Sequence, residues 1–101
     1  IMTNPQANRF VGPVVKNSEI GDAILEAIYQ DNQGREIEVE EHASYTRVKV
    51  EKECVIRFDT VSSMLGREAS RGDIEANMPS LEGFIRVNSE QMRFLATAET
   101  E

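Results

Sequence analysis

The sequence contains one cysteine, one histidine, no tryptophan and only six aromatic residues among its 101. A single cysteine excludes an internal disulfide, so the reducing cytoplasm is the compartment that we expect. Cys54 and His42 cannot build a zinc site by themselves, because such a site needs a full set of ligands. The few aromatic residues, without basic residues interleaved, do not provide a platform for stacking nucleic-acid bases.

Basic residues and long apolar runs are also scarce. The chain has 11 Lys and Arg against 18 Asp and Glu, which gives a formal net charge of −7. Nucleic acids and anionic membrane surfaces both attract clustered Lys and Arg, so we expect neither as a partner. No run approaches the roughly 18 apolar residues of a membrane span. The acidic balance instead favours attraction to a basic patch on another protein.

Length and composition fit one folded domain with one modest core. The hydrophobic fraction of 40% and the charged fraction of 29% are ordinary for a globular protein. We expect a single domain over residues 9–97, with a flexible polar tail at residues 1–8 and a polar C-terminal tail at residues 98–101.

One helix is strongly indicated after a first strand. Residues 10–15 are apolar and β-branched but include Pro13, which predicts an edge strand or a bulge at Gly12-Pro13. Asn17-Ser18 then supplies an N-cap, and Gly34 suits the left-handed C′ position. Between them, apolar residues recur at helical spacing: Ile20, Ile24, Ala27 and Ile28.

The apolar period changes from 3.6 to 2 after this helix, which indicates antiparallel strands with one face exposed to water. The expected core faces are Ile37 and Val39, then Thr46, Val48 and Val50, then Cys54, Ile56 and Phe58. We interpret Lys52, between two glutamates, as part of a hairpin turn. Glutamates of the first strand would then lie beside Arg47 and Lys49 of the second.

Two short helices and a hairpin complete the expected domain. Asp59-Thr60 opens a helix that Gly66 stops, and Ser70 with Asp73 resembles a capping box before a second helix carrying Ile74 and Met78. A final hairpin is expected over residues 83–96, with its turn at 88–90. The order β-α-β-β-β-α-α-β-β predicts an α+β protein with antiparallel sheets.

Candidate catalytic groups are few. His42 has no positioned partner, which a general base requires, so we interpret it as a solvated turn residue. Cys54 shares the apolar face with Ile56, which favours a buried structural thiol over a reactive one. The glutamates recur at every second position, as on one face of a strand, and we interpret them as solvated. The sequence has no Glu-x-x-His pair and no glycine-rich phosphate loop, so we expect no catalytic, metal or cofactor residues.

Four segments, in collinear order over roughly residues 10–96, resemble a known family. They are Val11-Gly12-Pro13-Val14-Val15; Asp31-Asn32-Gln33-Gly34-Arg35-Glu36-Ile37-Glu38-Val39-Glu40, similar to D-N-x-G-x-E-I-x-V-E; Val61-Ser62-Ser63-Met64-Leu65-Gly66-Arg67; and Gly83-Phe84-Ile85 with Gln91-Met92-Arg93-Phe94. The chain thus resembles the effector, or coupling, proteins of bacterial multicomponent diiron monooxygenases, and Val-Gly-Pro is closest to the toluene monooxygenase branch.

The resemblance implies a regulatory protein that carries no cofactor and is not itself an enzyme. Such a protein binds the diiron hydroxylase component, reshapes its active site, and raises the turnover and coupling of hydrocarbon hydroxylation. It also implies that the chain competes for, or shares, a hydroxylase surface with the ferredoxin or reductase, and that it is a monomer when free. Physically, this is a coupling free energy between a surface site and a buried site.

Exposed residues that folding does not need are the candidates for partner binding. Tyr29 is the expected anchor, because Tyr is enriched among interface hot spots. The candidates lie on the first helix, in the turn after it and in the second helical region: Asp22, Glu26, Tyr29, Gln30, Asn32, Gln33, Ser62, Ser63, Arg67, Arg71 and Asn77.

Two other functions stay open at the level of the residues. One is a small-molecule-sensing α+β regulatory domain, which would need an apolar pocket with convergent polar groups. The other is a small ferredoxin-like enzyme that uses His42 and an acidic residue.

Overall fold

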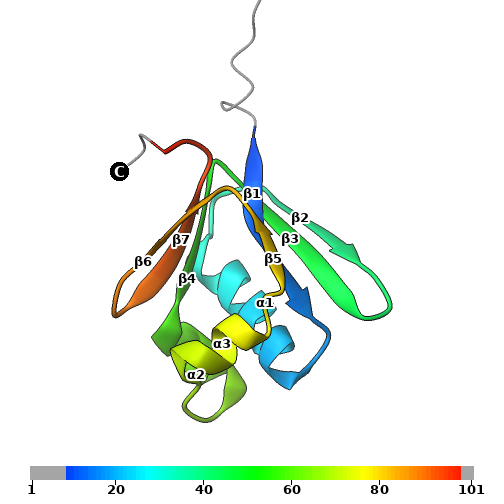
Figure 1. The fold of residues 1–101 in the computed structure, drawn as a ribbon, viewed down its shortest axis with the longest axis vertical. Coiled ribbons are helices and arrows are strands. Elements are labelled where there is room, and N and C mark those ends of the chain that lie inside the picture. Colours follow the sequence, from blue (N-terminus) through cyan, green and yellow to red (C-terminus); the bar gives the residue numbers. More distant parts are fainter. Residues whose placement is uncertain (1–8, 99–101) are drawn as a thin grey trace, which may run out of the picture.

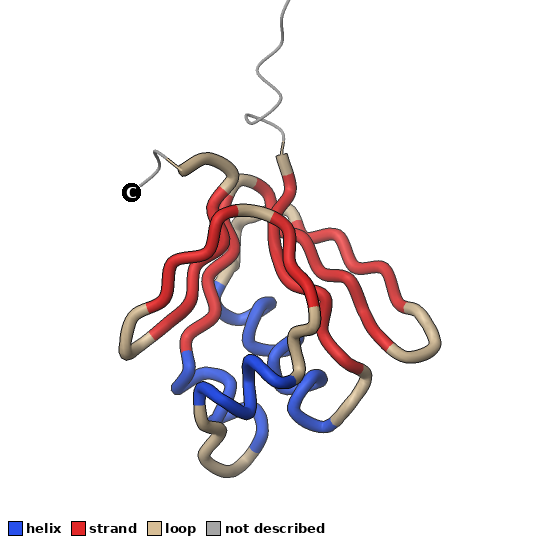
Figure 2. The backbone as a smooth tube through the Cα atoms, viewed as in Figure 1, coloured by secondary structure: helices blue, strands red, loops and turns tan. Residues whose placement is uncertain are grey.

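The structure is a computed structural model that describes residues 9–98. Within this range, two antiparallel sheets diverge from the end where the termini lie, and three helices lie between their open ends (Figure 1). Helices and strands occupy distinct parts of the molecule (Figure 2), and the expected α+β class is confirmed. The elements are β1 (Phe10–Lys16), α1 (Glu19–Asp31), β2 (Ile37–Glu41), β3 (Tyr45–Glu51), β4 (Glu53–Arg57), α2 (Phe58–Leu65), α3 (Arg71–Ala76), β5 (Ser80–Glu82), β6 (Phe84–Val87) and β7 (Gln91–Leu95).

The first sheet has the strand order β2-β3-β1-β5 and the second has the order β4-β7-β6. The core lies between them, because the inner face of each sheet and one face of α1 are apolar. Its fully buried side chains come from β1 and β3 in the first sheet, from β4 and β7 in the second, and from all three helices: Val11, Val15, Val48, Val50, Cys54, Ile56, Met92, Phe94, Ile24, Ala27, Ile28, Val61 and Ile74.

The predicted helix signals are largely confirmed. The hydroxyl of Ser18 accepts a hydrogen bond from the Gly21 backbone N–H at 2.9 Å, and that of Ser70 accepts one from Asp73 N–H at 3.0 Å. Gly66 caps α2 in the left-handed conformation, with φ 85°. Gly34 also has a positive φ, but α1 is capped by Asn32, so Gly34 lies one position beyond the predicted C′.

Strand β1 is neither an edge strand nor bulged, so both alternatives that Pro13 suggested are wrong. It lies between β3 and β5, and its register with β3 stays constant from Phe10 opposite Glu51 to Lys16 opposite Tyr45. The proline is tolerated because the ladder with β3 is interrupted there. Gly12 is required at this point, since a Cβ would overlap the Val48 carbonyl oxygen.

Lys52 does not form a hairpin turn. The strands before and after it belong to different sheets, so Lys52 is the corner between them, with a left-handed φ of 73°. Its N–H donates to the Arg9 carbonyl at 2.9 Å and its carbonyl accepts from Ala96 N–H at 3.1 Å. These two bonds hold the joined ends of the sheets together.

Four smaller expectations also need correction. Val39 does not join the core but is exposed, Phe58 begins α2 and is half-buried, and Met78 lies beyond the end of α3. The three-residue strand β5 was not predicted. The expected tail at 1–8 and residues 99–101 of the expected C-terminal tail lie outside the described residues. No helix of the described part is long and apolar enough to cross a membrane.

Candidate binding surfaces

The outward face of α1 and the turn after it carry several of the predicted partner-binding residues. Asp22, Glu26 and Gln30 are exposed, as is Gln33 just after the helix. Tyr29 is 48% exposed, an unusual position for a large aromatic ring. These five side chains are therefore accessible to a partner.

Asn32 is not a surface residue, which corrects its place among the exposed candidates. It is only 2% exposed, and its side-chain amide donates to the carbonyls of Val55 at 2.7 Å and Ile28 at 2.8 Å. Its Oδ1 accepts from Val55 N–H at 2.8 Å. Asn32 thus ties the end of α1 to β4, and its role is structural.

Two candidates of the second helical region also serve the fold. The Ser62 hydroxyl accepts from Ala69 N–H at 2.9 Å, which holds the turn after α2. The Asn77 side chain accepts from the Ser18 hydroxyl at 2.6 Å and donates to the Asp73 carbonyl at 2.8 Å. Both side chains are only partly accessible.

The other three candidates of this region are exposed. Arg67 forms an ion pair with Glu19 of α1 at 3.1 Å, and Arg71 forms one with Glu75 at 2.8 Å. Ser63 is exposed on α2. Exposed ion pairs contribute little to stability, so these arginines remain available for exchange with a partner's carboxylates.

An apolar surface at the edges of the two sheets was missed by the sequence reasoning. Leu81, Phe84 and Ile85 are 41%, 44% and 38% exposed, and we refer to them as the β5–β6 rim. Strands β5 and β6 are the edge strands of the first and second sheet, joined across the top of the molecule by Gly83 alone (Figure 1). The only sequence signal for this surface was a group of apolar residues on both sides of Glu82-Gly83. Such a group is equally compatible with a strand that the rest of the fold covers.

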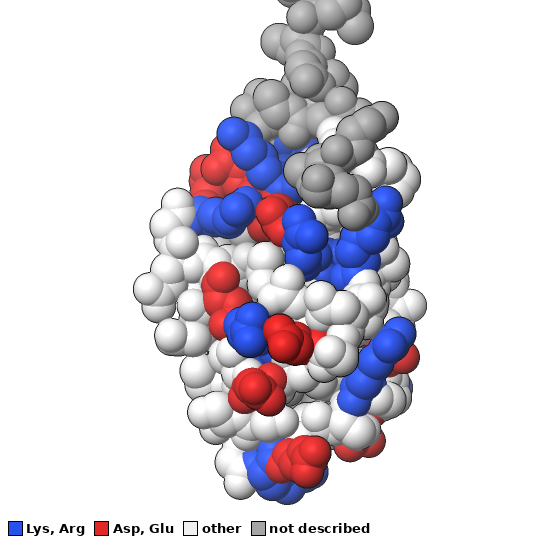
Figure 3. Space-filling model, turned by 90° about the vertical axis from the view of Figure 1, so that its left-hand side faces the viewer, with Lys and Arg blue, Asp and Glu red and all other residues white. Residues whose placement is uncertain are grey.

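The outer side of the second sheet carries many charged side chains. Basic side chains gather toward its upper part, with acidic ones among them (Figure 3). Arg93 pairs with Glu53 across β7 and β4 at 2.6 Å, and Arg57 donates to the Gln91 side chain at 3.2 Å. Although the whole chain is strongly acidic, this side of the molecule carries both basic and acidic side chains.

Two open hollows lie on either side of the connection between β1 and α1. One, of about 620 Å³, runs between α1 and β2 and is lined by Leu25 and Val39 with Asp22 and Glu41 at its margin. The other, of about 610 Å³, lies on the outer face of the first sheet and includes Arg47. The first is acidic at its margin, whereas the second carries cations.

Cys54 and His42 lie where the sequence places them. Cys54 is fully buried, and burial raises the pKa of its thiol, with Asp31 and Glu53 adding to the rise and Arg35 opposing it. The His42 ring is exposed and stacks on Tyr45, with ring centroids 4.6 Å apart. Among the described residues, no three His, Cys, Asp or Glu side chains cluster as metal ligands would.

The fold and these surfaces define a class of protein: a small α+β domain of two antiparallel sheets on a helical layer, with an apolar rim and open hollows where another molecule can bind. The sequence matches the MmoB/DmpM family over residues 9–95, and the chain belongs to that family.

Individual relatives agree with the family. The chain is 32% identical, over 84 residues, to the effector subunit of an alkene monooxygenase system from Xanthobacter autotrophicus (strain ATCC BAA-1158 / Py2); the match covers 83% of each chain. Its fold is similar to that of a chain in a phenol hydroxylase–regulatory protein complex, with a TM-score of 0.75, 22% identity and coverage of 86% of this chain and 98% of that one. It is also similar to soluble methane monooxygenase regulatory protein B, with a TM-score of 0.67, 20% identity and coverage of 99% and 72%.

Proposed function

We propose that this chain is a cofactor-free regulatory protein that binds the diiron hydroxylase of a multicomponent monooxygenase, reshapes its active site, and raises turnover and coupling. The observation that carries this proposal is the match to the alkene monooxygenase effector subunit over most of both chains. The family match over residues 9–95 supports it. The toluene branch stays a prediction, since the relatives named above belong to alkene, phenol and methane systems.

Docking is proposed through the β5–β6 rim together with the exposed face of α1. Exposed large apolar side chains favour an interaction site, and Phe84 on the rim and Tyr29 on α1 are the largest of them among the described residues. The exposed candidates are proposed to supply its polar contacts: Asp22, Glu26, Gln30, Gln33, Ser63, Arg67 and Arg71. The remaining three candidates contribute indirectly, by hydrogen bonds that hold the fold: Asn32, Ser62 and Asn77.

The regulatory effect requires a difference in affinity between hydroxylase states. An effector that bound every state equally would shift none of them, however tightly it bound. We propose that the chain binds best to the state that is competent for hydroxylation, and that it competes for or shares a surface with the ferredoxin or reductase. We also propose that the free protein is a cytoplasmic monomer, which light scattering after gel filtration tests for the oligomeric state.

The decisive experiment is a titration of the protein into a purified hydroxylase of this class with its electron-transfer partners. The quantity measured is hydroxylated product per NADH consumed. We expect a saturable rise near one effector per active site. Ser89→Ala, a change at the tip of the β6–β7 turn, is the matched control and should behave as the native chain. A flat response with a cognate hydroxylase would overturn the proposal.

A second candidate function, small-molecule sensing, is favoured by one observation. The hollow on the outer face of the first sheet combines the apolar Val14 and Pro79 with Arg47 and Lys16. An apolar wall with convergent polar groups is what a ligand site requires. We propose no catalytic role for His42, which stacks on a neighbouring ring at the tip of a hairpin.

A further inference from the structure

The outer face of the first sheet is not covered by any helix of the described chain (Figure 1). Antiparallel register places Val14 opposite Arg47 and Lys16 opposite Tyr45. These residues alternate along their strands with buried neighbours such as Val15, so their side chains point to the outer face. All four line the hollow of about 610 Å³.

The hollow exists because the sheet is incomplete there. Strand β5 begins only at Ser80, so no strand pairs with β1 beside Lys16, whose N–H donates instead to the Asn77 carbonyl at 2.9 Å. The loops around the gap are fixed by hydrogen bonds. Asn17 donates from its backbone to the Ser44 carbonyl at 3.1 Å and from its side chain to the His42 carbonyl at 2.7 Å. The walls are therefore preformed, as in most small-molecule sites.

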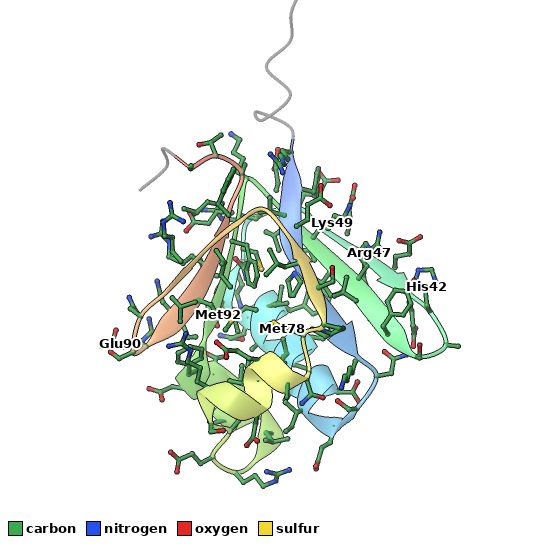
Figure 4. The ribbon with its side chains drawn as sticks, in the orientation of Figure 1. His42, Arg47, Lys49, Met78, Glu90 and Met92 are labelled. Carbon is green, nitrogen blue, oxygen red and sulfur yellow. The ribbon has the colours of Figure 1, made fainter. Side chains whose placement is uncertain are left out.

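Arg47 is the unusual member of this face. Its Nε is buried and has no hydrogen-bond partner. Glu40 lies opposite it in register, yet the Glu40 carboxylate pairs with His42 Nε2, 3.7 Å away. The next cation along the face, Lys49, is already paired with Glu82 at 3.0 Å, and Figure 4 labels both cations on β3. A buried polar atom without a partner points to a missing group that accepts its hydrogen bond.

We propose that this hollow binds a small organic acid. Its carboxylate meets the guanidinium of Arg47 and the ammonium of Lys16, and its apolar body rests against Val14, Pro79 and the ring of Tyr45. The planar guanidinium matches a carboxylate in geometry and charge. The volume falls within the range of roughly 300–1,000 Å³ that ligand pockets occupy. Because the whole chain carries a charge of −7, the attraction is local to these two cations.

The test is an NMR titration of the isotope-labelled protein with benzoate, which combines a carboxylate with a compact apolar ring. We expect saturable shifts of the Arg47 Nε–H signal and of the amides of Ser44 and Tyr45. Benzyl alcohol supplies the ring without the charge, and sulfate supplies a charge without the ring. Both should bind more weakly than benzoate. Equal binding of benzyl alcohol, or no saturable shift with benzoate, would overturn the proposal.

Two variants distinguish binding at this site from a non-specific attraction between benzoate and positive charge. Arg47→Gln should weaken benzoate binding about tenfold or more, since charge-assisted hydrogen bonds are lost. Lys49→Gln is the matched control: it removes one cation from the same strand and face but should leave the affinity unchanged. If Arg47→Gln failed to fold, Lys16→Met would take its place. Unchanged affinity in Arg47→Gln would count against the site. No hydroxylase is involved, so failure here leaves the proposed function untouched.

Discussion

Two adjacent polar residues, Asp31 and Asn32, join the end of α1 to the second sheet and to α2. Asp31 Oδ2 accepts from Arg57 N–H at 2.8 Å and Oδ1 from the Thr60 hydroxyl at 2.9 Å. Asn32 satisfies both backbone groups of Val55. Asp31-Asn32, which belongs to the segment that carries part of the family resemblance, therefore connects α1 to the second sheet and to α2. The sequence could not indicate this, because Val55 lies 23 residues from Asn32.

Replacing Asn32 by alanine should destabilise the domain strongly. The change leaves the N–H and C=O of Val55 without their partner, at about 1–3 kcal/mol for each unsatisfied group. We expect a loss of roughly 2–6 kcal/mol in the free energy of unfolding, measured by urea denaturation. Gln33→Ala, at the exposed neighbouring position, is the control and should change stability by less than about 0.5 kcal/mol. Similar losses for both variants would contradict this role.

Cys54 should make stability depend on alkaline pH. The pKa of its thiol is raised by burial in the folded state, whereas in the unfolded chain it is near the usual value of about 8.5. Below that pH both states hold the proton and Cys54 has no effect. Above it the unfolded chain alone loses the proton, so stability falls by about 1.4 kcal/mol per pH unit. Comparing native and Cys54→Ala unfolding between pH 8 and 10.5 checks this; identical pH slopes would refute it.

At the scale of elements, features with local signals were predictable and features that depend on distant partners were not. The caps at Ser18, Ser70 and Gly66 follow from hydrogen bonds within one turn, so the sequence locates them. The corner at Lys52 looks like a hairpin turn, because only sheet membership distinguishes the two. Strand β5 has three exposed residues and no alternation, so it exists only through pairing with β1.

The link between β5 and β6 predicts a position where only glycine fits. Gly83 has φ 114°, and a Cβ there would lie 2.9 Å from the Leu95 carbonyl oxygen and 2.9 Å from Val11 Cγ1. Gly83→Ala should therefore cost at least about 2 kcal/mol by thermal or urea unfolding. Gly72→Ala in α3 is the matched control, since a Cβ there meets nothing closer than Ser70 Oγ at 3.8 Å. It should be neutral or stabilise by about 0.5–1 kcal/mol.

Viewed as a whole, the molecule separates most of its exposed carboxylates from the apolar β5–β6 rim. Exposed carboxylates line α1 and β2, whereas the apolar rim lies on the edges of the two sheets. The sequence predicted the exposed polar candidates from helical spacing, because period alone identifies the outward side of a helix. It could not predict the rim, since an apolar residue on an edge strand and one on a covered strand look alike.

This separation predicts two distinguishable parts of docking on a hydroxylase. Phe84→Ser with Ile85→Ser removes apolar area but no charge, so it should raise the concentration for half-maximal activation about tenfold or more without altering its dependence on salt. Asp22→Asn with Glu26→Gln removes charge but little area. This variant should associate more slowly than the native chain at low salt. The difference between the two should be smaller near 0.5 M salt, because salt screens steering by exposed charges. Activation assays across a salt series, with unfolding measured on each variant, check both. Equal salt dependence for the two double variants would show that the rim and the helix face do not divide docking in this way.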